Sequence, residues 1–334
     1  MNCIRKFKML EKVFDHSTNK HLRTTKNPGD KLTMRIEIVG GVASSRWNAV
    51  NRQRILAHRR AWEAYLRVAN ECGLLDGENG KELVNRLRSR GDDDLRSSMA
   101  ECLVCWYCHK RLNLPVEPKP PGKGKKQLEM LVKHPDGDLN VEVKAPLRET
   151  AAKTWRWNDA DALEKCLRKA NKQFRKGLIN VLAIVPVFRT PVTLERNQLL
   201  NAFFGKLAIR ITVGEPASRD LAGDELVIKP SGRFVRPAKP DRSPGFTRVS
   251  GVVCIEERLR DRYPLDYVPI DDEQNFKTYM AKLWSDKNRH WFEHRVHIAV
   301  NPLAPVKMPA LNDDTAVVLQ VVDGGLSWID GRLY

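Results

Sequence analysis

The sequence predicts an α/β protein in which a central mixed sheet is flanked by helices. Three neighbouring patterns lead to this prediction. Two runs of alternating apolar and polar residues lie on either side of the Pro-Asp-Gly-Asp segment at residues 135–138, which is typical of a β-hairpin. An amphipathic helical pattern comes next, and a short, wholly apolar run typical of a buried strand follows it. Helix, hairpin, helix and buried strand in succession favour an α/β core.

The residues before this core are basic and largely helical in pattern. Residues 1–33 are polar and basic, and we expect a flexible segment there. In region 34–94, residues 46–72 and 81–90 carry apolar side chains at helical spacing among many arginines, which predicts a basic helical region. Residues 95–112 are apolar on nearly every side, so the helix predicted there is expected to be buried.

The predicted core covers residues 95–213. Its hairpin is followed by a helix over 159–175, which has an apolar stripe at helical spacing and ends near Gly177. A fully buried strand is predicted over 180–188. Weaker signals then indicate a helix at 193–205 and a strand at 206–213.

The C-terminal third reads as a linker followed by strands. Residues 214–245 are rich in Pro, Gly, Ser and basic residues, which predicts a loop or linker. Residues 246–334 form a strand-rich extension, with strand-like runs at 246–259, 295–302 and 315–322. The pattern leaves open whether these strands extend the core sheet or form a small second module.

Composition limits the classes of function. Of the 334 residues, 42% are hydrophobic and 30% charged, as in ordinary globular proteins. No apolar run is long enough to span a bilayer, and the N-terminus lacks a secretory signal. With seven cysteines and no signal we expect a cytoplasmic protein without a disulfide framework. The formal net charge of +17 points to a polyanionic partner, and we expect nucleic acid rather than a membrane.

The hairpin brings two carboxylates and an amine to one face. If Asp136-Gly137 forms a two-residue turn, Lys144 lies opposite Glu129, and Glu142 points to the same face as both. The other face is apolar, with Leu128, Met130, Val132, Leu139, Val141 and Val143. Carboxylate oxygens are suitable ligands for Mg²⁺, and a lysine beside the metal can orient a nucleophile or stabilise phosphate charge.

The stretch LEMLVKHPDGDLNVEVKAP resembles the core hairpin of the PD-(D/E)XK nuclease superfamily, and the resemblance covers residues 95–188. It implies a restriction-endonuclease-like core. It also implies that Glu129, Glu142 and the Val143 carbonyl ligate Mg²⁺, with Mn²⁺ as a substitute, and that Lys144 acts on the attacking water. Glu129 stands where the superfamily usually has Asp. The resemblance further implies supporting roles for two helical residues, Glu101 completing the metal site and Gln173 near it.

The function implied is a metal-dependent nuclease that hydrolyses DNA phosphodiester bonds, with a Mg²⁺-bound water attacking in line. The preference for DNA follows from the resemblance alone. Two alternatives stay open: a catalytically inactive nucleic-acid-binding protein on the same fold, and an RNA-processing nuclease. The sequence leaves open the oligomeric state, a dimer included, as well as cleavage specificity and endo- or exonuclease mode.

Two further patterns have competing interpretations. Cys102, Cys105, Cys108 and His109 have the spacing of zinc or iron–sulfur ligands. Inside a helix, however, three cysteines at every third position fan across one side as small hydrophobes, so we expect core packing. The basic runs at 123–126 and 165–176 are expected to contact phosphates if they flank a nuclease site.

Overall fold

The computed structural model describes two units of an α/β protein, which are treated separately below. The helical unit comprises residues 1–107, 187–192 and 256–295, and the sheet unit comprises 108–186, 193–255 and 296–334. Within them the described residues are 8–13, 49–89, 92–118, 128–146, 159–185, 199, 202–210, 225–230, 234, 246–259, 292–322 and 325–330.

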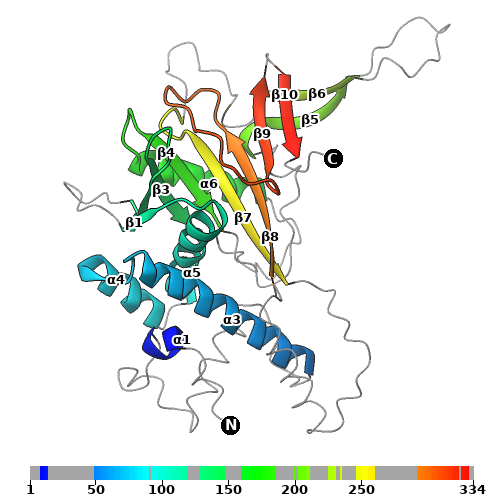
Figure 1. Ribbon diagram of the computed structural model, residues 1–334. Helices are drawn as coiled ribbons and strands as arrows, with labels where there is room; N and C mark the ends of the chain where they lie inside the picture. Colours follow the sequence, from blue (N-terminus) through cyan, green and yellow to red (C-terminus); the bar gives the residue numbers. More distant parts are fainter. Residues whose placement is uncertain are drawn as a thin grey trace, which may run out of the picture. The chain divides into compact units, whose positions relative to one another are not determined.

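The helical unit contains four helices among the described residues, and two of them lie in the basic helical region predicted at residues 34–94. The four helices are α1 (Lys8–Val13), α3 (Ala49–Glu71), α4 (Gly77–Arg88) and α5 (Asp92–Trp106), drawn in blue to cyan in Figure 1. The helix predicted over 95–112 is observed as α5 followed by a π-helical turn, Tyr107–Arg111. Its near-complete burial is confirmed, since Leu95, Cys102 and Cys105 are fully buried.

Helix α1 is the described part of the N-terminal segment 1–33, for which we expected flexibility. Leu10 and Val13 are 1% and 2% exposed. The Glu63 carboxylate accepts hydrogen bonds from the backbone N–H groups of Met9 and Leu10 at 2.9–3.1 Å. Because the first N–H groups of a helix have no partner within it, a carboxylate at this position satisfies them and complements the helix dipole. Burial of its apolar side chains and capping by Glu63 therefore stabilise α1, which lies in a segment whose composition predicted flexibility.

The sheet unit is built on an eight-stranded sheet with the order β1-β2-β3-β4-β7-β8-β9-β10. The pairs β1–β2, β2–β3 and β9–β10 are antiparallel, whereas β3–β4, β4–β7 and β8–β9 are parallel, so the sheet is mixed as predicted. The outer ends of β7 and β8 belong to the helical unit. The strands are β1 (Val116–Pro118), β2 (Met130–Val132), β3 (Leu139–Lys144), β4 (Ile179–Ile184), β7 (Gly251–Leu259), β8 (Phe292–Val300), β9 (Val317–Val322) and β10 (Gly325–Asp330).

The register of the β2–β3 hairpin differs from the predicted one by two residues. Leu131 pairs with Asn140 instead of Glu142. The turn is centred on Pro135-Asp136, because the Gly137 N–H donates to the His134 carbonyl at 3.0 Å. Proline favours the second position of a type I turn and glycine the fourth, which explains why this turn replaces the expected Asp-Gly turn. A shift of two residues leaves every side chain on its predicted face.

Strand β3, helix α6 (Asp159–Gln173) and strand β4 form a βαβ unit, because β3 and β4 are parallel (Figure 1). The predicted stripe of α6 is confirmed, and a positive φ of 78° at Gly177 follows the helix as expected. Residues 181–185 are all buried, as predicted for a strand in the middle of the sheet. The buried stripe of α6 consists of Leu163, Cys166, Leu167, Ala170 and Phe174.

The C-terminal strands extend the core sheet and do not form a separate module. Within the predicted linker at 214–245, the structure has strand β6 (Glu225–Pro230), which pairs with β5 (Gly205–Arg210) as a two-stranded antiparallel sheet. The run ELVIKP has three consecutive apolar residues with β-branched Val227 and Ile228, which favour a strand, although the surrounding Pro and Gly residues obscure it. Most of the helix predicted at 193–205 and the whole basic run at 123–126 lie outside the described residues.

In the part of the chain that the structure describes, no helix has both the length and the apolar character needed to cross a bilayer.

Candidate active site

The candidate site is built on β3, at the centre of the core hairpin. Glu142 is completely buried there, and Lys144, two residues further along the same face, keeps 23% of its side chain exposed. The Lys144 ammonium donates a hydrogen bond to Oε1 of Glu142 and forms an ion pair with it. The central strand therefore contains a carboxylate that has no access to solvent, and its counter-ion is a lysine that reaches the surface.

Glu129 lies next to this pair, immediately before β2. Its backbone N–H donates to the Val141 carbonyl at 3.2 Å, which continues the hairpin ladder. Its carboxylate oxygen Oε2 accepts a hydrogen bond from the Val143 N–H at 3.3 Å. The observed register, extended by one pair, sets Glu129 opposite Glu142 rather than opposite Lys144. Both carboxylates and the amine remain on one face, and the two carboxylates are closer in register than the sequence predicted.

The electrostatics of Lys144 show that the three groups interact. Burial acts to lower the pKa of Lys144, but the charges of Glu142 and Glu129 and the hydrogen bond to Glu142 outweigh it, so that its pKa is raised. The amine therefore stays protonated at neutral pH. Chemically, Lys144 can stabilise negative charge or orient a nucleophile, but it cannot serve as a general base.

One oxygen of the buried carboxylate has no partner. Oε2 of Glu142 lies out of solvent and accepts no hydrogen bond from any described residue. A buried carboxylate oxygen without a donor is costly, and a bound cation is one way in which such an atom is satisfied. The donor set fits a hard divalent cation, because carboxylate and carbonyl oxygens are the ligands that Mg²⁺ and Mn²⁺ prefer.

The Val143 backbone contributes an oxygen on the Glu129 side. The Lys144 carbonyl accepts from the Val185 N–H, which follows β4. Carbonyl groups alternate in direction along a strand, so that of Val143 points away from β4, toward the edge where its own N–H meets Glu129. The predicted third ligand therefore lies on the same side as one predicted carboxylate.

Glu101 belongs to the helical unit and is engaged there. Both of its oxygens accept hydrogen bonds from the Arg86 guanidinium, at 2.7 and 2.9 Å. This two-pronged ion pair joins α4 to α5 and gives Glu101, which is 6% exposed, a structural role. We therefore leave Glu101 out of the metal ligands proposed below.

Gln173, at the last position of α6, has a side-chain oxygen that is buried without a hydrogen-bond partner among the described residues. No hydrogen bond joins it to Glu129, Glu142 or Lys144. Its orphaned acceptor is compatible with the predicted supporting role, which stays a prediction.

Cys166, which the sequence marked only as an apolar stripe residue, is a neighbour of the site. Burial raises the pKa of the Cys166 thiol to about 11, while the ammonium charges of Lys144, Lys169 and Lys165 act in the opposite direction. The thiol is therefore protonated and unreactive at neutral pH. The charge of Lys144, on β3, thus acts on the pKa of a thiol of α6.

The cysteines predicted to pack in the core are buried, with Cys102 and Cys105 at 0% and Cys108 at 7% exposed. Among the residues that the structure describes, no three His, Cys, Asp or Glu side chains gather as a metal-binding group. The candidate site itself therefore offers two carboxylates and a backbone oxygen, with no third side-chain ligand in the described ranges.

The helical unit holds a second polar cluster that the sequence did not indicate. The Tyr65 hydroxyl donates to Glu257 at 2.8 Å and lies 2.9 Å from Nε2 of His294, whose ring is tilted against that of Trp106 with centroids 4.8 Å apart. Burial raises the pKa of Glu257 to about 7, although the hydrogen bond from Tyr65 lowers it in part. Residues 192 and 229 positions apart meet here, which no local pattern could have revealed.

Comparisons with known proteins identify no relative: no family model, curated protein or solved structure matches this chain.

Proposed function

We propose that this protein is a metal-dependent nuclease of the PD-(D/E)XK type that hydrolyses DNA phosphodiester bonds. The observation that supports it most is the unpartnered buried oxygen of Glu142, beside a protonated lysine and a second carboxylate. The order of α5, the β2–β3 hairpin, α6 and β4 along the chain agrees with the order expected for a restriction-endonuclease-like core.

In this proposal Glu142, Glu129 and the Val143 carbonyl hold Mg²⁺, for which Mn²⁺ can substitute. A cation there supplies Lewis-acid stabilisation of the phosphate and acidifies water. Lys144 provides a fixed positive charge beside the scissile phosphate and orients the nucleophile. The hydrogen bond from Val143 to Glu129 fixes one carboxylate, and the ion pair with Lys144 fixes the other, so that neither must reorganise during the reaction.

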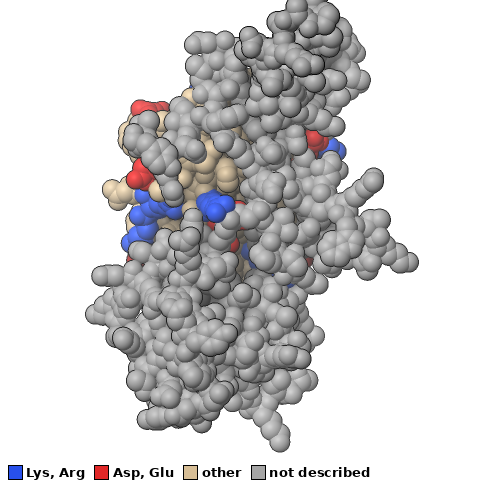
Figure 2. Space-filling model, turned by 90° about the vertical axis from the view of Figure 1, so that its right-hand side faces the viewer, with Lys and Arg blue, Asp and Glu red and all other residues tan. Residues whose placement is uncertain are grey.

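The charge of the whole chain agrees with a nucleic-acid substrate. The formal net charge is +17. On the described part of the face drawn in Figure 2, Lys and Arg side chains lie next to one another as a blue group. Cationic side chains gain affinity for nucleic acids by displacing counterions from the phosphates.

A non-catalytic nucleic-acid-binding protein is the second candidate. Two observations favour it: Glu142 already has Lys144 as its counter-ion, and the described residues bring no third side-chain ligand to the site. In that case the ion pair is purely structural, and divalent cations do not bind.

Cleavage of supercoiled plasmid with Mg²⁺ and with Mn²⁺ tests the proposal. Glu142→Gln and Lys144→Met are expected to lower cleavage by about a hundredfold or more, the range seen when key electrostatic groups are removed. Glu129→Asp should be tolerated, because it keeps the carboxylate. The matched control is Asp138→Asn, which changes a carboxylate of the same hairpin whose one ion pair among the described residues is with Lys133.

Calorimetry with Mn²⁺ separates the candidates. The nuclease proposal requires binding that Glu142→Gln abolishes. A wild-type protein that binds DNA but neither binds Mn²⁺ nor cleaves any nucleic acid would refute it in favour of the non-catalytic candidate. Cleavage of RNA but not DNA would support the RNA-processing alternative.

A further inference from the structure

The outer face of α6 carries a continuous row of basic side chains, here named the α6 basic ridge. All of its members are exposed. They recur every three or four residues, so they lie along one side of the helix and just beyond its end. At 1.5 Å per residue the row extends over about 16 Å. The ridge consists of Lys165, Arg168, Lys169, Lys172, Arg175 and Lys176.

Helix stability does not explain this row. Like charges four residues apart, such as Lys165 and Lys169, destabilise a helix by about 0.2–0.5 kcal/mol per pair. The helix dipole favours cations only in the last turn, which accounts for Lys172 but not for Lys165 or Arg168. Neither Lys165, Arg168 nor Lys169 forms an ion pair with any residue in the described ranges. These three residues thus concentrate positive charge that no ion pair in the described ranges offsets.

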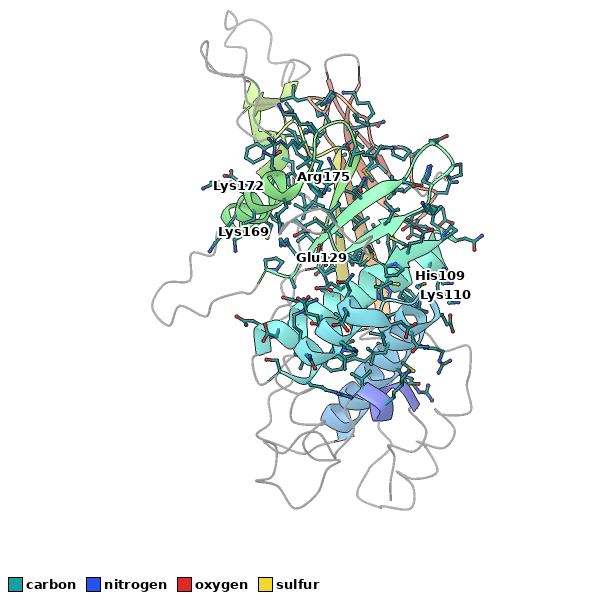
Figure 3. All side chains as sticks on the ribbon, turned by 90° about the vertical axis from the view of Figure 1, so that its left-hand side faces the viewer. His109, Lys110, Glu129, Lys169, Lys172 and Arg175 are labelled. Atoms are coloured by element: carbon teal, nitrogen blue, oxygen red, sulfur yellow. The ribbon has the colours of Figure 1, made fainter. Side chains whose placement is uncertain are left out.

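The first half of the ridge lies near the candidate site. The ammonium groups of Lys165 and Lys169 act on the Cys166 thiol, and so does that of Lys144. Because β3, α6 and β4 form one βαβ unit, the ridge and Lys144 belong to the same unit of the chain. In Figure 3 the side chains of Lys169 and Lys172 extend outward from α6.

The chemistry of the ridge favours nucleic acid over a lipid surface. An interfacial helix must offer an apolar face to the membrane, but the apolar face of α6 is buried in the sheet unit. The ridge also has no aromatic side chain on which single-stranded bases could stack. Its length corresponds to about five phosphates of one strand, at 3.4 Å of helix axis each.

We propose that the α6 basic ridge binds the sugar–phosphate backbone of duplex DNA and holds one strand beside Glu129, Glu142 and Lys144. Binding of the DNA backbone by the ridge does not depend on the proposed nuclease function. The further statement that the ridge holds a strand for cleavage rests on that function. Such contacts are independent of sequence, so the ridge sets the position of the duplex and not the choice of site.

Two triple variants that remove the same charge from different places test the proposal. The ridge variant is Lys165→Gln, Arg168→Gln and Lys169→Gln. The matched control is Lys81→Gln, Lys110→Gln and Lys307→Gln, which are exposed basic residues that do not belong to α6. Both variants are first checked for an unchanged circular dichroism spectrum and melting temperature. If the ridge variant fails the check, the single variant Lys169→Gln replaces it.

Binding of a labelled 20-base-pair DNA duplex (about two helical turns) is followed by fluorescence anisotropy in EDTA, where no cleavage occurs. The ridge variant should bind about tenfold or more weakly at low salt, and its log–log salt slope should fall by about 2–3, since each lost phosphate contact removes about 0.9. The single variant should lower the slope by about 1. The control should stay within about threefold of the wild type.

Equal losses in both triple variants would show that binding depends on total charge, and would overturn the proposal. Unchanged duplex binding by the ridge variant would overturn it too, as would loss of binding to anionic vesicles with duplex binding retained. The two proposals can fail separately. If the wild type binds duplex through the ridge but does not cleave with Mg²⁺ or Mn²⁺, the binding proposal stands and the nuclease proposal is refuted. Conversely, if the wild type cleaves plasmid and the ridge variant binds duplex as the wild type does, the nuclease proposal stands and the binding proposal is refuted.

Discussion

The Glu142–Lys144 pair illustrates how a buried charge depends on a single partner. Glu142 has no access to solvent, so Lys144 provides its main compensation in the described structure. Removing one member of a buried pair leaves the other uncompensated, whereas removing both members costs less. The pair therefore contributes to stability as a unit, whatever its role in catalysis.

We predict that Lys144→Met lowers the free energy of unfolding by about 3–5 kcal/mol, the range for a broken buried pair. The double variant Glu142→Gln/Lys144→Met should be less destabilised than the sum of the two single variants by about 1 kcal/mol or more. Urea unfolding in EDTA measures all three variants without metal binding. Simple additivity would show that the two side chains are not coupled.

The raised pKa of Glu257 predicts a pH dependence of stability. Because the folded state raises this pKa to about 7, folding favours the protonated carboxyl. The stabilising contribution is complete below the unfolded pKa of about 4.3 and is lost as pH rises through 7. Glu257→Gln mimics the protonated form. It should melt near the wild-type temperature at pH 4.5 and about 3 °C or more above it at pH 8.

Glu82→Gln is the matched control for this experiment, since Glu82 is an exposed carboxylate on α4. Its melting temperature should follow that of the wild type at both pH values. Should Glu257→Gln melt no higher than the wild type at pH 8, the carboxyl would already be charged in the folded protein without penalty.

At the scale of elements, local sequence patterns predicted most of the helices and strands that carry an apolar period of their own. The helices α3 to α6 and the strands β3, β4, β7, β8 and β9 lie within a few residues of their expected positions, because each carries an apolar period of its own. Strand β1 was missed since it lies in a proline-rich run, and β10 lacks a strong alternating signal. The Gly-rich surroundings of β6 hid it in the same way.

In the candidate site, too, the features that depend on local pattern were predicted and those that depend on distant residues were not. Alternation alone fixed the common face of Glu129, Glu142 and Lys144, because a two-residue change of register preserves it. The pairing within that face depends on the turn, and the turn is centred on Pro135-Asp136 instead of the predicted Asp136-Gly137. The burial of Glu142 and the engagement of Glu101 by Arg86 depend on distant elements, and no local pattern encodes them.

The hairpin turn itself offers an element-scale test. Gly137 has a φ of 130°, and a Cβ there would lie 2.9 Å from Cδ1 of Ile179. Gly137→Ala should therefore lower the free energy of unfolding by about 1–3 kcal/mol, through backbone strain and steric overlap together. Gly177→Ala is the control, because its φ is also positive but open space surrounds it. Urea midpoints for the two variants should differ in that order, and the reverse order would contradict the observed turn.

At the scale of the whole molecule, the excess of 58 Lys and Arg over 41 Asp and Glu predicts how binding responds to salt. Duplex binding without metal should weaken steeply as salt rises, with a log–log slope of about −4 or steeper. Titrations at several salt concentrations measure this slope. A slope near zero would exclude a nucleic-acid partner held by phosphate contacts.

The helical unit consists of three stretches separated by parts of the sheet unit. The hydrogen-bond partners of Tyr65, Glu257 and His294, lie 192 and 229 residues further along the chain. During synthesis on the ribosome, the first helices therefore emerge long before the residues that complete their polar cluster. Until the last third of the chain has been synthesised, those helices are either partly assembled or bound by a chaperone. For the same reason, no single cut in the gene could separate one unit from the other.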